Sequence, residues 1–480
     1  MDSKKVFNNF IWRFLERCGA QGVAFVVSIV LARLLDPTVY GTVALITVFT
    51  TIMQVFVDSG LGTALIQKKD ADDTDFSTVF YFNLGMCILL YAIMFFAAPY
   101  IAAFYENDSL VPIIRVLSLT LVISGLMSIQ QSFVSRNMLF KRFFFSTLGG
   151  TLVSAAVGIV MAYKGFGVWA LVGQTLFSQF ISTIILWVTV KWRPKLVFSF
   201  TRLKGLFSFG WKILTSALID TVYKDLRSLI IGKLYSSEAL AFYNKGQQFP
   251  QLIVNNINVS IDSVLLPAMS NEQDDKEKVK AMTRRSIKIS TYIMMPLMIG
   301  MAVCAEPLIR LLLTEKWLPS VTFLRIFCLT FMIYPVHTAN LNAIKAMGRS
   351  DMFLKLEIIK KVIGLAVLIA TMWISVEAMA YSLLFIAVLS SFINAFPNKS
   401  LLGYSYKDQV VDIFPALMLS CVMGAAVYLI QFIGFGDILT LLIQVPLGAA
   451  VYIIGSKLLN LDSFGYVLSI FKSIIHKGSK

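Results

Sequence analysis

Apolar stretches of about 20 residues recur from one end of this 480-residue chain to the other. That length is what a helix needs to cross roughly 30 Å of hydrocarbon. With 57% hydrophobic and 14% charged residues, an ordinary soluble domain and a disordered chain are both excluded. The sequence therefore predicts an all-α polytopic membrane protein with about fourteen spans. The expected spans are 10–34, 38–60, 76–103, 110–134, 143–163, 167–190, 206–234, 238–268, 283–304, 318–344, 351–373, 375–397, 411–433 and 437–457.

The connections between these spans alternate in charge. Basic residues gather on every second connection, while the opposite ones, such as "FYENDS" and "GFGD", are short and nearly free of base. By the positive-inside rule, both termini are expected in the cytoplasm, in a protein of the cell inner membrane. The formal charge of +15 is then a topology signal and does not indicate a nucleic-acid partner. The basic termini and connections hold Lys4, Lys5, Lys68, Lys69, Arg136, Lys141, Arg142, Lys191, Arg193, Lys195, Arg202, Lys204, Lys276, Lys278, Lys280, Arg284, Arg285, Lys345, Arg349, Lys399, Lys407, Lys472, Lys477 and Lys480.

An internal repeat divides the chain. "RVLSLTLVISGL" from Arg115 matches "RIFCLTFMIYPV" from Arg325, and "LARLLDPTVYG" aligns with "IGKLYSSEALA" further on. An even number of spans in each copy gives two parallel six-helix repeats, an arrangement found in secondary transporters with the substrate site between the halves. We expect six-helix lobes at 1–200 and 201–405 around a central cavity, and two additional helices at 406–460. An amphipathic cytoplasmic tail, lying on the inner leaflet or docked on the protein, is expected at 461–480.

The seventh span carries four charges at its middle, Asp220, Lys224, Asp225 and Arg227. Asp220 and Lys224 have the four-residue spacing of an intrahelical ion pair, and Arg227 continues their stripe. A self-neutralised polar stripe inside a bundle is one interpretation. The other is a water-filled cavity, in which Lys224 and Arg227 contact an anionic substrate and Asp220 or Asp225 takes the coupling cation, H⁺ or Na⁺.

The first span raises the same question, because Arg13, Glu16 and Arg17 lie near its start. The two arginines and Gln21 share one helix face by their four-residue spacing. They are either headgroup anchors or cavity residues, and the equivalence with the seventh span favours the cavity. Membrane lipids are partners under either interpretation.

Three further residues are weaker cavity candidates. Arg115 and Arg325 are repeat equivalents near span ends, where their side chains can instead snorkel to the membrane surface. His337 lies in an apolar span and is either a hydrogen-bonded packing residue or a proton carrier. The five cysteines show no metal-ligand spacing, and no sequence motif for a nucleotide or other cofactor is present. No loop shows a carboxylate pair or a nucleophile–base pattern, so we expect neither a catalytic residue nor an enzyme.

The segments "SIVLARLLDPTVYGTVAL", "DSGLGTALIQKKD", "QQSFVSRNMLFKR" and "GFGVWALVGQ" resemble polysaccharide flippases. The similarity is to the Wzx-like branch that exports colanic-acid or teichuronic-acid repeat units, within the multidrug/oligosaccharidyl-lipid/polysaccharide exporter superfamily. It implies alternating access by two lobes and a substrate of oligosaccharide on an undecaprenyl pyrophosphate carrier. It also implies a pyrophosphate-binding role for Arg13 and Arg17, with Glu16 beside them.

Two other functions stay open at this point. One is a cation-coupled exporter of drugs or small molecules with the same fold, against which the basic first span argues. The other is a membrane glycan polymerase or ligase, against which the missing catalytic outer loop argues.

The predicted topology can be tested by labelling single cysteines with an impermeant thiol reagent. Cysteines at Asp73, Ser199 and Ser479 should react only from the cytoplasmic side, and one at Asn107 only from outside. Labelling of position 479 from outside would contradict the model.

Overall fold

A computed structural model describes residues 3–58 and 60–469, apart from the side chains of 3–11, 13–18, 209 and 260. The described residues form helices and no β-strand, which confirms the all-α fold class. Eleven of these helical segments are long and apolar enough to cross a membrane. The three other expected spans correspond to α1, whose apolar part Gly19–Leu34 is shorter, and to α9 and α15, so the count of fourteen stays a prediction.

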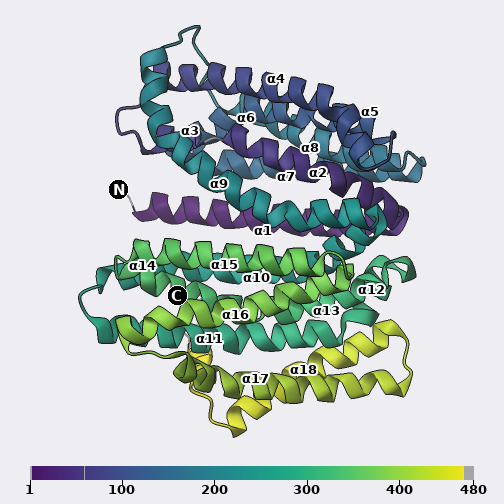
Figure 1. Cartoon of the computed structure of the whole chain (residues 1–480), viewed down its shortest axis with the longest axis vertical. Coiled ribbons are helices and arrows are strands. Elements are labelled where there is room, and N and C mark those ends of the chain that lie inside the picture. The colour runs from purple at the N-terminus through teal and green to yellow at the C-terminus, as the bar shows by residue number, and fades with distance from the viewer. Residues whose placement is uncertain (1–2, 59, 470–480) are drawn as a thin grey trace. The chain divides into compact units, whose positions relative to one another are not determined.

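The chain divides into two compact units, 1–241 and 242–480. In unit 1 most of the long helices lie side by side with their axes roughly aligned (Figure 1). Its helices are α1 (Ser3–Leu34), α2 (Pro37–Asp58), α3 (Leu61–Gln67), α4 (Asp73–Phe104), α5 (Leu110–Leu117), α6 (Leu119–Arg136), α7 (Phe140–Tyr163), α8 (Val168–Thr189) and α9 (Phe200–Leu234).

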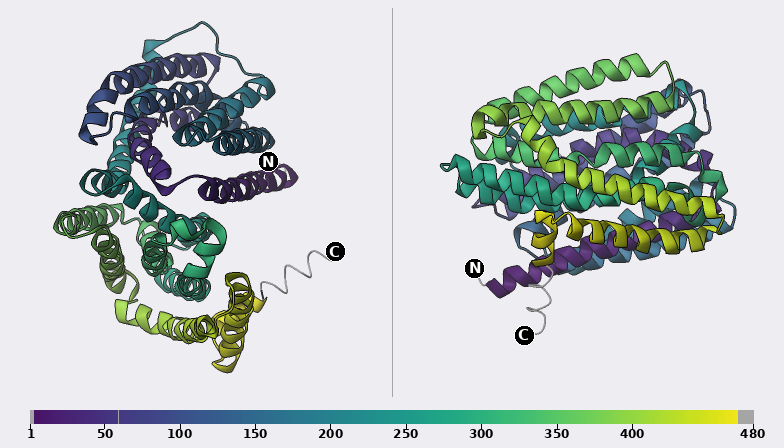
Figure 2. Two further views of the ribbon diagram at one scale, coloured as in Figure 1. Left: turned by 90° about the vertical axis from the view of Figure 1, so that its right-hand side faces the viewer. Right: turned by 90° about the horizontal axis from the view of Figure 1, so that it is seen from below.

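Unit 2 begins within α10 (Ser237–Asn271). Its last two long helices, drawn in yellow-green and yellow in Figure 2, pack on the rest of this unit through α11 and α12. Its other elements are α11 (Lys276–Val303), α12 (Ala305–Leu313), η1 (Glu315–Trp317), α13 (Ser320–Phe331), α14 (Tyr334–Ala346), α15 (Ser350–Thr371), α16 (Val376–Leu402), α17 (Tyr406–Leu429), η2 (Ile430–Ile433) and α18 (Asp437–Leu458).

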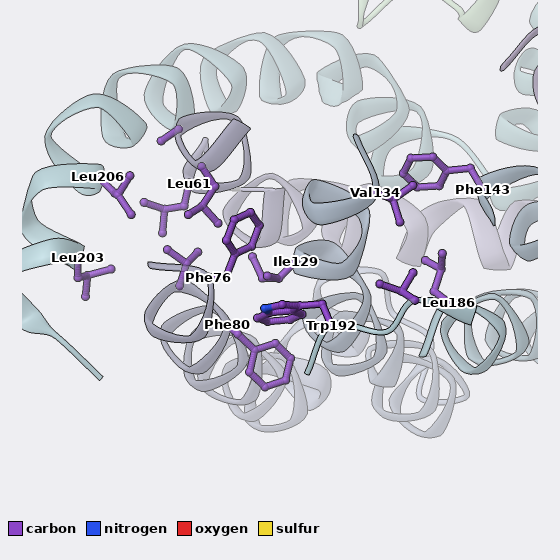
Figure 3. Packing of buried hydrophobic residues seen from close by; sticks show 14 residues of the cluster. Leu61, Phe76, Phe80, Ile129, Val134, Phe143, Leu186, Trp192, Leu203 and Leu206 are labelled. Atoms are coloured by element: carbon purple, nitrogen blue, oxygen red, sulfur yellow. The ribbon is translucent and has the colours of Figure 1, made fainter. Parts of the chain in front are cut away.

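A core cluster of unit 1 is built from α3, α4, α6, α7, α8 and α9. Trp192, in the connection after α8, lies between Phe80 and Ile129, with Phe76 close by (Figure 3). The ring centroids of Trp192 and Phe76 are 5.8 Å apart. Leu203 and Leu206 of α9 are buried in the same cluster. Burial of such side chains stabilises the unit by roughly 1.5–3 kcal/mol each.

Helix α9 is held in unit 1 at both ends. Near its start, Arg202 forms an ion pair with Asp72, the N-cap of α4, and this hydrogen bond lowers the pKa of the Asp72 carboxyl. At its end, Lys233 Nζ lies 2.8 Å from a carboxylate oxygen of Glu106. Between these points α9 packs against α2, α3 and α4. The boundary between the two compact units therefore lies after the end of α9, at 241/242. The repeat predicts a boundary before α9, at 200/201, and this stays a prediction about the repeat.

A close approach of α9 explains the break between α2 and α3. Gly60 has a φ of 64° and an added Cβ would lie 2.7 Å from the carbonyl oxygen of Gly210. Only glycine fits such a position without strain. The repeat-equivalent helix in unit 2, α10, runs without interruption through its corresponding region.

The described part of the tail, residues 462–469, is helical. Phe464 and Val467 pack against the cluster formed by α11, α17 and α18. The Arg285 guanidinium lies 3.7 Å from the centre of the Tyr466 ring. This segment therefore docks on unit 2, which was one of the two arrangements expected from the sequence; residues 470–480 lie outside the described part.

Candidate functional site

The charges of the seventh predicted span lie on α9. Asp220 and Asp225 are half-buried and Lys224 is exposed. The ion pairs of the described residues do not include the predicted pair of Asp220 with Lys224. Instead Lys224 interacts electrostatically with Asp225, its neighbour in sequence. This pair therefore does not decide between the polar stripe and the water-filled cavity.

Arg227 differs from the other three because it is only 5% exposed. Its Nε and Nη2 atoms are buried and have no hydrogen-bond partner. A buried donor without a partner costs about 1–3 kcal/mol, and more for a charged group. Such a group in a native structure needs an explanation, and a role in ligand binding is one.

The two unpartnered nitrogens of Arg227 form one edge of its guanidinium. Arg284 uses this same edge in unit 2, where its Nε and Nη2 each lie 2.7 Å from an oxygen of Asp412. That fork-to-fork geometry suits carboxylates and phosphates. Arg227 therefore presents a two-donor edge of the right shape for an oxyanion, in a buried place where charge-assisted bonds are strong.

The repeat-equivalent arginines have protein partners. Arg115 Nε donates to the carbonyl oxygen of Phe95, and Arg325 Nε to that of Ala302, both at 3.3 Å. The matching bonds show that the repeat is preserved in side-chain detail. They give both residues a structural role, and a part in ligand binding stays a weaker prediction.

His337 lies on α14 and has a partner within unit 2. Its Nδ1 is 3.3 Å from Nδ2 of the buried Asn394, and its ring packs edge-on against Tyr334. These contacts support the interpretation of His337 as a packing residue.

The first-span candidates are placed only in part. The backbone of α1 contains Arg13, Glu16 and Arg17, but their side chains lie outside the described residues. Gln21 is exposed on the same helix. Helix α1 packs chiefly on α7, and helix α9 packs chiefly on α2. Both charged helices therefore belong to unit 1. Whether their charged faces line one cavity stays a prediction.

Sequence reasoning did not single out Lys245, which is only 6% exposed on α10. Its Nζ donates to Oε1 of Gln248 at 3.0 Å and lies 5.7 Å from the ring centre of Trp317. A lysine inside an apolar span was the available signal. Across the described ranges, no group of three or more His, Cys, Asp or Glu side chains is arranged to hold a metal ion.

Comparison with known proteins identifies the family. Residues 30–322 match the model of the family described as polysaccharide biosynthesis protein. The chain belongs to this polysaccharide biosynthesis protein family. The match confirms the resemblance to Wzx-like flippases that the sequence motifs indicated, and it places the chain among membrane transport proteins, not enzymes.

Curated relatives cover most of the chain. The teichuronic acid biosynthesis protein TuaB of Bacillus subtilis is 24% identical over 80% of this chain and 79% of its own length. The lipopolysaccharide biosynthesis protein WzxC of Escherichia coli is 21% identical over 88% of each chain.

Solved structures show the same fold. The lipid II flippase MurJ in an inward closed conformation gives a TM-score of 0.77 at 14% identity, covering 94% of this chain and 98% of that one. A multidrug resistance MATE transporter in an inward-facing conformation gives 0.64 at 15% identity, covering 80% and 94%. These similarities confirm the two-lobe fold of the exporter superfamily.

The unpartnered state of Arg227 predicts an unusual response to substitution. Arg227→Met removes a buried charge without breaking a protein contact, so the thermal midpoint in detergent should equal or exceed that of the wild type. Arg284→Met is the matched control, because it removes the fork that holds the buried Asp412 and should cost about 1–3 kcal/mol. Equal destabilisation by both substitutions would show that Arg227 has a structural partner.

Proposed function

We propose that this protein flips an oligosaccharide repeat unit, linked to undecaprenyl pyrophosphate, from the inner to the outer leaflet of the cytoplasmic membrane for surface polysaccharide export. The observation that carries the proposal is the guanidinium edge of Arg227, which has no hydrogen-bond partner and is buried on a helix of a polysaccharide biosynthesis membrane protein. A pyrophosphate group offers the oxyanions that such an edge binds.

The relatives support this substrate class. Their names refer to teichuronic acid, lipopolysaccharide and lipid II, and another relative is the succinoglycan biosynthesis transport protein ExoT of Rhizobium meliloti. These glycans differ from one another, so we infer that the shared fold binds the part that the substrates have in common, the lipid-linked headgroup. The sugar composition is left unassigned by this reasoning.

In the proposed mechanism, cationic side chains replace water around the pyrophosphate as it leaves the cytoplasmic leaflet. Arg227 contributes two parallel donors, and Lys224 contributes a point charge one helical turn away. Arg13 and Arg17 contribute two more guanidiniums from α1, with Glu16 holding Arg13 in the resting state. Alternating access of the two lobes then exposes the headgroup to the outer leaflet.

Coupling to a cation gradient belongs to the same proposal. Asp220 or Asp225 takes H⁺ or Na⁺ beside the phosphate-binding cations, so cation binding and anion release are linked through the local charge.

A second function is an exporter of drugs or small molecules, which the structural similarity to the MATE transporter favours. A buried unpartnered arginine argues against cationic drugs as substrates, since like charges repel in a medium of low dielectric constant. A glycan polymerase or ligase is the third possibility, and the family match argues against it.

Arginine variants of α1 test the substrate-binding role. A contact between an ion and a charged group is worth roughly 1.5–3 kcal/mol, so Arg17→Ala should weaken binding of a pyrophosphate-linked glycan lipid about ten- to a hundredfold. Arg17→Lys should recover only part of this loss, and Glu16→Ala should weaken binding less than loss of either arginine. Binding and flipping are measured on purified variants at matched protein levels. Wild-type activity in an Arg13→Ala, Arg17→Ala double variant would leave both residues as headgroup anchors.

Neutral variants of the α9 carboxylates test the coupling role. In Asp220→Asn or Asp225→Asn, flipping in proteoliposomes should lose its dependence on an imposed proton or sodium gradient, because the charge that takes the cation is gone. Glu238→Gln, in the first turn of α10, is a control that should keep gradient dependence. Full gradient dependence in both aspartate variants would make these residues structural.

A further inference from the structure

Unit 1 contains a cavity of about 200 Å³ that the α9 charges do not line. It lies among α2, α3, α4 and α6. None of the residues that line it is basic, and Asp58 is its one charged residue. Its other polar lining includes Thr63, Asn83, Ser128, Gln131 and Ser132.

The amide of Asn83 marks the inner wall of this cavity. Asn83 is 2% exposed, and its Nδ2 donates to the hydroxyl oxygen of Ser128 at 2.6 Å. The amide oxygen Oδ1 is buried and has no hydrogen-bond partner. A buried acceptor without a partner is unfavourable, so a hydrogen-bond donor or a cation bound in the cavity would stabilise this oxygen.

Asp58 lacks a compensating charge. Its Oδ1 accepts a hydrogen bond from the neutral amide of Gln54 at 3.2 Å. Among the ion pairs of the described residues, none includes Asp58. The Asp58 side chain is exposed where it lines the cavity, so its carboxylate is accessible to a cation, which its negative charge attracts.

The repeat supplies an internal comparison. In unit 2, Asp262 on α10 accepts a hydrogen bond at 2.7 Å from Nδ2 of Asn342, which is 1% exposed on α14. The alignment of Arg115 with Arg325 places Ser132 at the position of Asn342. In unit 2 the amide donor of the aspartate thus comes from another helix, α14, whereas in unit 1 it comes from Gln54 of the same helix. The position of Asn342 is taken in unit 1 by the short hydroxyl of Ser132, which lines the cavity.

We propose that this cavity binds one hydrated sodium ion, held by the Asp58 carboxylate, the Asn83 amide oxygen and the hydroxyls of Ser128 and Ser132. All of these donors are oxygens, which suit hard cations. One carboxylate balances one positive charge, so a monovalent ion fits better than calcium, whose sites use more carboxylates. The volume exceeds that of a bare ion and leaves room for several waters at about 30 Å³ each.

The core of unit 1 supports one wall of the site. Leu61 and Ile129 line the cavity and are also buried members of the cluster around Trp192 (Figure 3). An ion bound in this cavity would therefore lie next to the start of α3 and next to the packed core. The inference goes beyond the proposed function, because sodium binding at this site requires neither a lipid-linked substrate nor the α9 carboxylates.

Equilibrium binding of radioactive sodium to the purified full-length protein, in choline buffer of constant ionic strength, tests the proposal. Wild type should show saturable binding and a sodium-dependent rise in thermal midpoint that choline does not produce. Asp58→Asn should weaken this binding at least tenfold. Ser132→Asn, which copies the arrangement of unit 2, should weaken sodium binding as much as Asp58→Asn does while keeping the sodium-free midpoint, so a loss of binding is separated from misfolding.

Asp262→Asn is the matched control in unit 2. Because Asp262 is already satisfied by Asn342, this variant should keep the sodium response of the wild type at the cavity of unit 1. An unchanged sodium response in both Asp58→Asn and Ser132→Asn would overturn the proposal. A wild-type midpoint that follows pH and ignores sodium would also overturn it, and would make Asp58 a proton site.

Discussion

A charge inside an apolar helical bundle must be neutralised, hydrogen-bonded or left for a ligand, and this constraint organises both units. Asp75 is fully buried and receives Lys68 at 2.7 Å, while Asp412 receives the fork of Arg284. These pairs tie helices together within each unit. Arg227 has no such partner for two of its nitrogens, and this difference is the reason that we propose a ligand-binding role for it.

Much of the fold could be predicted from the sequence, because apolar length and charge on connections are local properties. The repeat also predicted that Arg115 and Arg325 are equivalent, and both donate to a carbonyl of the preceding long helix. The place of α9 could not be predicted, since it depends on contacts distant in sequence, such as those of Lys233 and Gly210. The break at Gly60 has the same long-range cause.

The candidate site was predictable only in its residue types. Four charges in one span were visible, but helical spacing suggested an Asp220–Lys224 pair and gave no means to see which charge lacks a partner. Burial and hydrogen bonding single out Arg227. The cavity around Asn83 could not be predicted, because a neutral amide and serines in an apolar span form no distinctive sequence pattern. Comparison with the Asn342–Asp262 hydrogen bond of unit 2 is what draws attention to these residues.

The central claim is that an oxyanion carried on a lipid crosses the membrane through this protein. Reconstitution of the purified chain in proteoliposomes, with an undecaprenyl-pyrophosphate-linked glycan in the inner leaflet, tests it most directly. An impermeant reagent that modifies the sugar reports its arrival in the outer leaflet. The account predicts protein-dependent arrival that Arg227→Met slows at least tenfold, while an equally stable Arg115→Met variant slows it less. Arrival at the rate of protein-free vesicles, or equal transport by the Arg227→Met protein and the wild type, would contradict it.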